Sequence, residues 1–370
     1  MTGARKQIRA IRTCWHLVRH PLARHQAPLS KAQDRPPGMG EGCSRRVFLM
    51  ASGILLLAAA VRVGFWASRK PYWFADSSMY LEASLVLEPP WDRPLGYPAF
   101  ISLAASVTDS LDSVVLAQHL LALLSAAMLF RIARRRLGMS PPASLLLLVA
   151  VALSPRSVLY AQYILSETVF SFLVIAFLVV ISAGGPPTVR RVALAGTLLA
   201  ATASVRLVGL SLVPLGVAWV LLRKARTRLF VAYLLTFGLP LVSYCGLYQA
   251  KHGEFSLASF DGWSLFGLVS RFFDCGALRE SPTKSILCKH PRIYAEGRSG
   301  DFFMWSGDSP AWDLANKVGG PVRANAELRS VSWQTIAAFP GAYLAAVAEE
   351  IAQFAGNLDS PPGSERFYWF

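Results

Sequence analysis

Long runs of apolar residues recur along the whole chain. A membrane-crossing helix needs about 20 consecutive apolar residues, and a chain inside lipid satisfies its backbone hydrogen bonds within helices or closed barrels. The pattern therefore predicts an all-α, polytopic membrane protein. Runs of span-like length occupy 47–67, 114–133, 142–158, 167–184, 192–222 and 229–249, and a weaker run occupies 334–354.

The run 192–222 is too long for one ordinary span, and Arg206 interrupts it. Arg190 and Arg191 precede the run, and 223-RKARTR-228 follows it. Basic residues beside a span favour the cytoplasmic side of the membrane. With both flanks cytoplasmic the run must cross twice, so we expect a tight hairpin of two short helices with Arg206 near its outer tip.

The same charge rule orients the remaining segments. The tail and turns inferred to be cytoplasmic carry many basic and few acidic residues, whereas the outer segments carry both in near balance. We therefore expect a multi-pass plasma membrane protein, located in the inner membrane if the source is bacterial. Its expected regions are a disordered basic cytoplasmic tail (1–46), a domain of about seven spans (47–250) whose first outer loop is 68–113, an extracytoplasmic loop region (251–335), and an interfacial or membrane helix with the C-terminal tail (336–370).

Composition narrows the function classes. Of the 370 residues, 54% are hydrophobic and 16% are charged, against about 25% charged in soluble domains. The net charge of +15 is concentrated beside the spans, so it indicates topology and not nucleic-acid binding. The sequence contains no P-loop, H-E-x-x-H, G-x-S-x-G or paired C-x-x-C motif. ATP-driven transport, zinc proteolysis and serine hydrolysis therefore have no local support.

The cysteines suggest one covalent link. Five cysteines are too few for a disulfide scaffold. Cys275 and Cys288 lie in the same polar loop, which the topology places on the outer side, where disulfides persist. We expect a disulfide between them, the alternative being two free thiols.

Three ionisable residues from separate segments fall at the outer level of the membrane. Asp76 follows the first span, Glu167 begins the fourth, and Arg206 lies at the hairpin tip. Charges near the bilayer are costly, so such a grouping favours a functional site. Each residue also has a structural explanation: Asp76 as a helix N-cap, Glu167 as a first-turn acid and Arg206 as a snorkelling side chain.

Two further polar residues lie within apolar runs. Arg62, late in the first span, is expected either to snorkel toward the interface or to pair with a nearby acid. His119 is expected to be a satisfied polar residue between helices and not a base.

A set of short motifs then resembles a known family. In their order, spacing and sidedness they are similar to the GT-C membrane glycosyltransferases, specifically the group related to protein O-mannosyltransferases and aminoarabinose transferases. The resemblance covers roughly residues 47–250. The motifs are 75-ADSSMYL-81, 93-RPLGYPAF-100, 117-AQHLLALLSAAMLF-130, 153-LSPRSVLYAQYILSET-168 and 196-GTLLAATASVRLVGL-210.

The resemblance implies a GT-C-like helical bundle with a large extracytoplasmic loop. It also implies a polyprenyl-phosphate-linked sugar donor and transfer on the extracytoplasmic side to a glycan, lipid or protein acceptor. The family's first-loop acid, its catalytic base, corresponds to Asp76. Its second-loop acidic position corresponds to Glu167, and the arginine after the fifth-span segment corresponds to Arg206.

The chain departs from the family pattern in two places. Members often carry two adjacent acids in the first loop, whereas Ser77 follows Asp76 here. Many members also have several more spans after the large outer loop. A truncated or non-catalytic member, acting as an assembly partner, is therefore an alternative, and a lipid-linked sugar flippase or transporter is another.

The expected chemistry follows from the residue types. Asp76, partly desolvated, would deprotonate the acceptor hydroxyl, and single-step attack would invert the anomeric centre. Arg206 would bind the phosphate of the donor through its forked guanidinium. Glu167 would position the base or the acceptor, or hold a divalent cation; no metal site is assigned, since isolated carboxylates are weak metal sites. Further expected substrate-binding residues are Arg93, Tyr80 and Tyr97.

Overall fold

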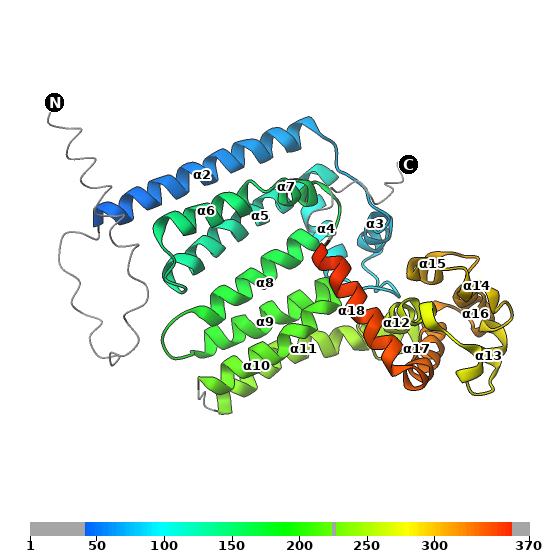
Figure 1. Ribbon diagram of the computed structural model, residues 1–370. Coiled ribbons are helices and arrows are strands. Elements are labelled where there is room, and N and C mark those ends of the chain that lie inside the picture. Colours follow the sequence, from blue (N-terminus) through cyan, green and yellow to red (C-terminus); the bar gives the residue numbers. More distant parts are fainter. Residues whose placement is uncertain (1–40, 224–226, 357–370) are drawn as a thin grey trace. The chain divides into compact units, whose positions relative to one another are not determined.

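The computed structural model describes residues 41–223 and 227–356, which form helices and no strand beyond one isolated bridge (Figure 1). The prediction of an all-α fold is confirmed for this part of the chain. Two compact units divide the protein. The first comprises Met1–Glu88 and Leu95–Pro240, and the second comprises Pro89–Pro94 and Leu241–Phe370.

The first unit holds the apolar helices. Its elements are α2 (Glu41–Ser68), α3 (Ser77–Val86), α4 (Gly96–Ala105), α5 (Leu111–Arg135), α6 (Pro141–Ala152), α7 (Pro155–Gln162), α8 (Glu167–Ser182), α9 (Val189–Val205), the 3₁₀ turn η1 (Leu207–Leu212), α10 (Val213–Leu222) and the first part of α11 (Thr227–His252). The segment expected as the first outer loop therefore contains two short helices, α3 and α4.

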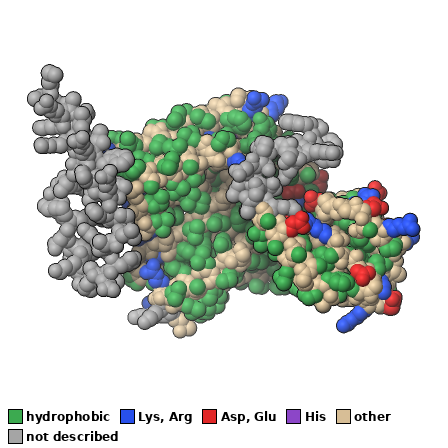
Figure 2. Space-filling view, viewed as in Figure 1, with side chains coloured by type: hydrophobic (Ala, Val, Ile, Leu, Met, Phe, Trp, Pro, Cys, Tyr) green, Lys and Arg blue, Asp and Glu red, His purple; other side chains and the backbone are tan. Residues whose placement is uncertain are grey.

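Four of the described helical segments are long and apolar enough to cross a membrane: Arg45–Ser68, Leu111–Arg135, Pro141–Gln162 and Thr227–His252. They coincide with four of the predicted runs. Figure 2 shows hydrophobic side chains spread over the visible face of these helices, and on α2 the side chain of Leu56 is 71% exposed. Such a surface is suited to lipid and not to water.

The run 192–222 is divided at Arg206. The helix α9 ends at Val205, and η1 and α10 continue after an extended residue. Helix α8 packs between α5 and α9 (Figure 1), so the N-terminus of α8 and the C-terminus of α9 lie close together. The interior between α8, α9 and α10 includes Phe177, Leu199 and Trp219.

The second unit is also helical. It contains the last part of α11, α12 (Asp261–Val269), η2 (Ser270–Phe272), η3 (Cys275–Ala277), α13 (Pro282–Leu287), α14 (Arg292–Ala295), α15 (Gly300–Trp305), α16 (Pro310–Val318), α17 (Pro321–Ala338) and α18 (Pro340–Gly356). Its core is aromatic, built around Trp263, Phe266 and Phe303. A disulfide joins Cys275 to Cys288, with the Cα atoms 5.9 Å apart.

A short piece of chain from between α3 and α4 belongs to this second unit. Trp91 lies 5.8 Å from Trp263, measured between ring centroids. Its carbonyl oxygen accepts hydrogen bonds from the Tyr248 hydroxyl at 2.7 Å and from the Ser259 amide at 2.8 Å. The first inter-helix segment is thereby anchored in the second unit by backbone and ring contacts.

The weak apolar run 334–354 is divided between two helices, and the helix expected within 336–370 corresponds to α18. Helix α17 ends at Ala338, and α18 begins at Pro340. Proline has no amide hydrogen and disfavours helical geometry in the residue before it, so the helix cannot continue through Phe339. The two halves of the run belong to two helices, and both of these pack against α12.

Candidate functional site

A cluster of polar side chains lies where α9 ends and α8 begins. The Arg206 guanidinium donates through Nη1 to Glu167 Oε1 at 2.5 Å and to Ser166 Oγ at 3.0 Å. The Ser166 hydroxyl also pairs with the Tyr80 hydroxyl at 3.2 Å. Ser166 and Tyr80 are buried, whereas Arg206 and Glu167 each keep 38% of the side chain exposed. The cluster therefore has an enclosed neutral side and an open charged side.

Close backbone packing fixes the chain around Arg206. A Cβ atom on Gly209 would lie 2.8 Å from the Ala203 nitrogen, and one on Gly96 would lie 2.4 Å from the Ser204 carbonyl oxygen. Real side chains do not approach this closely, so only glycine allows η1 and the start of α4 to press on the end of α9. Arg206 itself is extended, with φ −147° and ψ 132°. This geometry breaks the helix and directs the side chain toward α8.

Asp76 lies one helical turn from Tyr80, whose amide donates to the Asp76 carbonyl at 3.2 Å. It precedes α3 as the N-cap residue, but its side chain makes no capping hydrogen bond. Its backbone is αR, with φ −75° and ψ −17°, whereas capping side chains usually extend from β-region backbone. The helix-capping explanation of Asp76 is therefore wrong.

Ser77, which stands where a second acid was expected, has a structural task. Its Oγ accepts from the Phe74 amide at 2.9 Å and donates to the Ile164 carbonyl at 3.0 Å. These bonds fasten the turn that carries Asp76 to the segment between α7 and α8. Because Ser166 and Glu167 lie only two and three residues after Ile164, the fastening brings the Asp76 turn to the same region as the Arg206 cluster.

The two carboxylate oxygens of Glu167 differ in their hydrogen bonding. Its Oε1 binds Arg206, while Oε2 is enclosed and accepts no hydrogen bond from the described residues. A buried acceptor without a donor is costly, and such atoms in native structures call for a ligand, ion or water. Glu167 is also the first residue of α8, where the helix dipole favours an acid. The dipole alone does not account for the unsatisfied oxygen.

The remaining predicted substrate-binding residues, Tyr97 and Arg93, have partners of their own. Tyr97 is fully buried: its hydroxyl donates to Gln118 Oε1 at 2.9 Å, and its ring meets Tyr80 edge-on with centroids 4.8 Å apart. Tyr97 therefore packs against Tyr80 in the buried interior and supports its position. Arg93 belongs to the second unit and pairs there with Asp92 at 2.8 Å.

Arg62 does not snorkel, and it contacts no acid in the described chain. It is buried, with Nη2 donating to the Ala152 carbonyl at 3.1 Å and to Ser157 Oγ at 2.8 Å, and Nη1 lying 3.3 Å from His119 Nδ1. Ala152 ends α6, so the cation satisfies carbonyls at a helix C-terminus. His119 is a buried, hydrogen-bonded residue, as expected.

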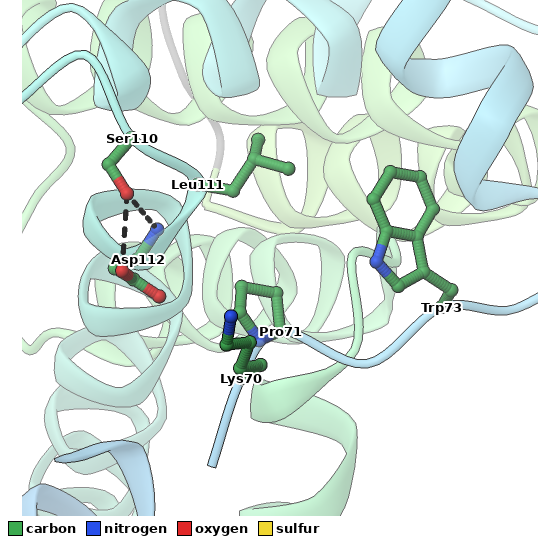
Figure 3. A pocket seen from close by; sticks show the side chains of 6 residues that line it. All are labelled: Lys70, Pro71, Trp73, Ser110, Leu111 and Asp112. Atoms are coloured by element: carbon green, nitrogen blue, oxygen red, sulfur yellow. Dashed lines mark hydrogen bonds between the residues drawn. The ribbon is translucent and has the colours of Figure 1, made fainter.

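A pocket of about 340 Å³ lies beside the loop that precedes Asp76. Figure 3 shows Trp73 facing Ser110 and Asp112, which are hydrogen-bonded to each other at the start of α5. The indole nitrogen of Trp66 donates to the Asp112 carbonyl at 2.9 Å and holds this end of α5 to α2. The lining residues are Lys70, Pro71, Trp73, Ser110, Leu111 and Asp112. The pocket combines an aromatic wall with charged and hydroxyl groups.

Sequence reasoning missed Ser166 and the carbonyl-binding role of Arg62. Ser166 occupies the N-cap position of α8, yet its Oγ makes no capping bond and serves Tyr80 and Arg206 instead. No local sequence pattern indicates these contacts of Ser166. Among the described residues, no group of three or more His, Cys, Asp or Glu side chains is placed to hold a metal ion.

The comparisons with known proteins give no match. No family model matches the chain, and no curated protein or solved structure matches it. The geometry of the cluster is therefore the basis for any functional conclusion.

Proposed function

We propose that this protein is a membrane glycosyltransferase of the GT-C kind. It would move a sugar from a polyprenyl-phosphate donor to an acceptor hydroxyl on a glycan, lipid or protein at the extracytoplasmic face. The observation that carries the proposal is the joining of Arg206, Glu167, Ser166 and Tyr80 in one hydrogen-bonded cluster, with Asp76 one helical turn before Tyr80 in the chain.

Arg206 suits the phosphate of such a donor. Its hydrogen bonds within the described part of the chain, to Ser166 and Glu167, both use Nη1, so Nε and Nη2 could donate to a ligand. A guanidinium fork matches phosphate oxygens and keeps its charge at every working pH. The phosphate leaves the sugar with its electron pair when the glycosidic bond breaks, and Arg206 would balance the charge that develops.

Asp76 suits the base. The acceptor oxygen attacks the anomeric carbon as its proton passes to the Asp76 carboxylate, and the bond from that carbon to the phosphate oxygen breaks. The substitution in one step inverts the anomeric centre. Glu167 would hold the guanidinium in place before the lipid-linked sugar binds. Its enclosed Oε2 supports a second role, which is to accept a hydrogen bond from the substrate.

The sidedness comes from the charge pattern. Basic turns at 131–136, 190–191 and 223–228 favour the cytoplasm, which leaves the end of α9 at the opposite face of a multi-pass plasma membrane bundle. An engineered cysteine at Ser78, an exposed residue beside Asp76, tests this with Cys14, Cys43 and Cys245 replaced. Labelling by an impermeant thiol reagent from the extracytoplasmic side supports the topology, and labelling only from the cytoplasmic side refutes it.

The activity is tested on purified protein in lipid nanodiscs with a panel of radiolabelled polyprenyl-phosphate sugars. Transfer to an acceptor that is lost in Asp76→Asn supports the proposal. In proteoliposomes, movement of the labelled lipid across the bilayer without transfer would identify a flippase instead. Binding without either event would identify a non-catalytic assembly partner.

A further inference from the structure

Gln162, the last residue of α7, has a fully buried side chain whose amide is fully used. Its Nε2 donates to the carbonyl oxygens of Arg69 and Lys70, both at 3.0 Å. Its Oε1 lies 3.0 Å from His119 Nε2. One side chain thus links the chain after α2, the end of α7 and the interior of α5.

The orientation of this amide is determined by its partners. Two carbonyl oxygens can accept only from the NH₂ group, so Oε1 must face His119. His119 Nε2 therefore carries the hydrogen, and Nδ1 accepts from Arg62 Nη1 at 3.3 Å. Arg62 is held in turn by the carbonyl of Ala152 and by Ser157. A second layer of buried side chains fixes Gln162 in a single arrangement.

The backbone of Gln162 extends the same connection. The Tyr72 amide donates to the Gln162 carbonyl at 2.9 Å, and the Ile164 amide donates to the Tyr72 carbonyl at 3.0 Å. With the Ser77 bond to Ile164, these contacts hold the chain on both sides of Asp76 against residues 162–164. The next residues, Ser166 and Glu167, bind Arg206.

We propose that Gln162 is a positioning residue of the candidate site. It sets the place of Asp76 relative to Ser166 and Arg206 by clamping the loop 69–77 on the segment 162–167. This inference rests on the proposed function for its catalytic consequence, but the clamp itself is a property of the fold. A base displaced by about 1 Å can lose about 100-fold in rate, so the clamp would act on kcat.

Two substitutions separate the contacts. Gln162→Met keeps the volume and removes all three side-chain hydrogen bonds. Gln162→Glu keeps an acceptor for His119 and, when ionised, loses both donors to the loop. The matched control is Gln118→Met. Gln118 is equally buried and anchors the same segment to α5 through the carbonyls of Ala161 and Tyr163, but it makes no bond to residues 69–72 in the described hydrogen-bond network.

Two readouts on full-length protein in nanodiscs decide the matter. Hydrogen exchange at the Tyr72 amide should rise by about tenfold or more in both Gln162 variants and far less in Gln118→Met. Transfer from a labelled polyprenyl-phosphate sugar should lose about 10- to 100-fold in kcat per folded molecule, with KM for the donor little changed. Loss of stability alone would raise exchange at protected amides throughout the first unit and leave kcat per folded molecule unchanged, whereas loss of the clamp raises exchange selectively in the loop and lowers kcat.

Unchanged Tyr72 exchange in Gln162→Met would overturn the proposal, as would equal effects of the Gln162 and Gln118 substitutions on that exchange; transfer is not compared between them, because Gln118 also accepts from the Tyr97 hydroxyl. If wild-type protein transfers no sugar, the proposed function fails. The exchange comparison then decides by itself whether Gln162 clamps the loop.

Discussion

Two arginines tie α8 to α9, one at each end of this helix pair. Replacing each of them in turn tests whether Arg206 acts in the proposed reaction or only holds the helices together. Arg206, at the end of α9, binds Ser166 and Glu167 at the start of α8. Arg191, in the first turn of α9, reaches the other end of α8. It donates to the Val180 carbonyl at 2.8 Å and to the Ile181 carbonyl at 3.1 Å, and it also binds the carbonyls of Ala183 and Gly184. Replacing either arginine by methionine removes one of the two ties.

The expected stability losses differ. The Arg206 pair is 38% exposed on both partners, and ion pairs of that exposure contribute about 0–1 kcal/mol. With the Ser166 bond included, Arg206→Met should cost about 1–2 kcal/mol. Arg191→Met would leave several carbonyls at the C-terminus of α8 without a donor, which should cost about 3 kcal/mol or more. Thermal unfolding in detergent or nanodiscs would measure both.

The expected activities have the opposite order. If Arg206 balances the departing phosphate, Arg206→Met should lower kcat by about 100- to 1,000-fold, the usual effect of removing one electrostatic donor. Arg206→Lys keeps a charge and loses the fork, so its transfer rate should lie between wild type and Arg206→Met. Arg191→Met should transfer sugar at the wild-type rate per folded molecule. The assay is transfer from a labelled polyprenyl-phosphate sugar, normalised to folded protein.

We therefore expect Arg206→Met to be the more stable of the two methionine variants and Arg191→Met to be the more active. Wild-type transfer by Arg206→Met would remove this residue from the site. Equal losses of transfer in the Arg206 and Arg191 variants would show that the tie between α8 and α9 matters and the phosphate contact does not.

Three further predictions concern other residues. Asp76→Asn should lower the transfer rate per folded molecule by about 100- to 10,000-fold as the loss of a general base; normal turnover would exclude Asp76 as the base. Serine at both Cys275 and Cys288 should lower the unfolding free energy of the second unit by about 3 kcal/mol, measured by denaturant unfolding followed at its tryptophans; an unchanged midpoint would contradict this. Partial burial acts to raise the pKa of Asp261, but hydrogen bonds from Asn325 and Arg329 outweigh it and hold that pKa below the ordinary 3.8. The stability contribution is therefore present above pH 3.8 and lost as the pH falls through the lower folded-state value, so the melting-temperature gap between wild type and Asp261→Asn should close on acidification, and a constant gap would refute it.

The helices of the membrane-length runs could be predicted because their signal is local. A continuous apolar stretch implies a helix without knowledge of its neighbours. The run 192–222 is too long for one span and has basic residues on both flanks. That is why the break at Arg206 was visible in the sequence. Pro340 divides the run 334–354 for a local reason too, because a proline disfavours helical geometry in the residue before it.

The contacts of the candidate site could not be predicted in the same way. Arg62 is buried because Ala152 ends a helix beside it, 90 residues further along the chain. Ser166 binds Tyr80, and nothing near either residue specifies the other. Asp76 looked like a helix cap because the residue type favours caps, whereas its backbone conformation, which decides the matter, depends on the bonds that Ser77 makes to Phe74 and Ile164.

Helix ends explain which charges in the first unit are structural. Cations are stabilised at helix C-termini and anions at N-termini, and Arg62 at the end of α6 and Arg191 at the end of α8 both obey this rule. Arg206 does not, because its guanidinium reaches the N-terminus of α8, where the helix dipole disfavours a cation. Glu167 offsets part of that cost. The same two features, a helix N-terminus and a guanidinium, both attract an anion, so a phosphate placed there would gain from each. If the donor is phosphate-linked, as we propose, its phosphate would be stabilised at this end of α8 by the guanidinium and the helix N-terminus together.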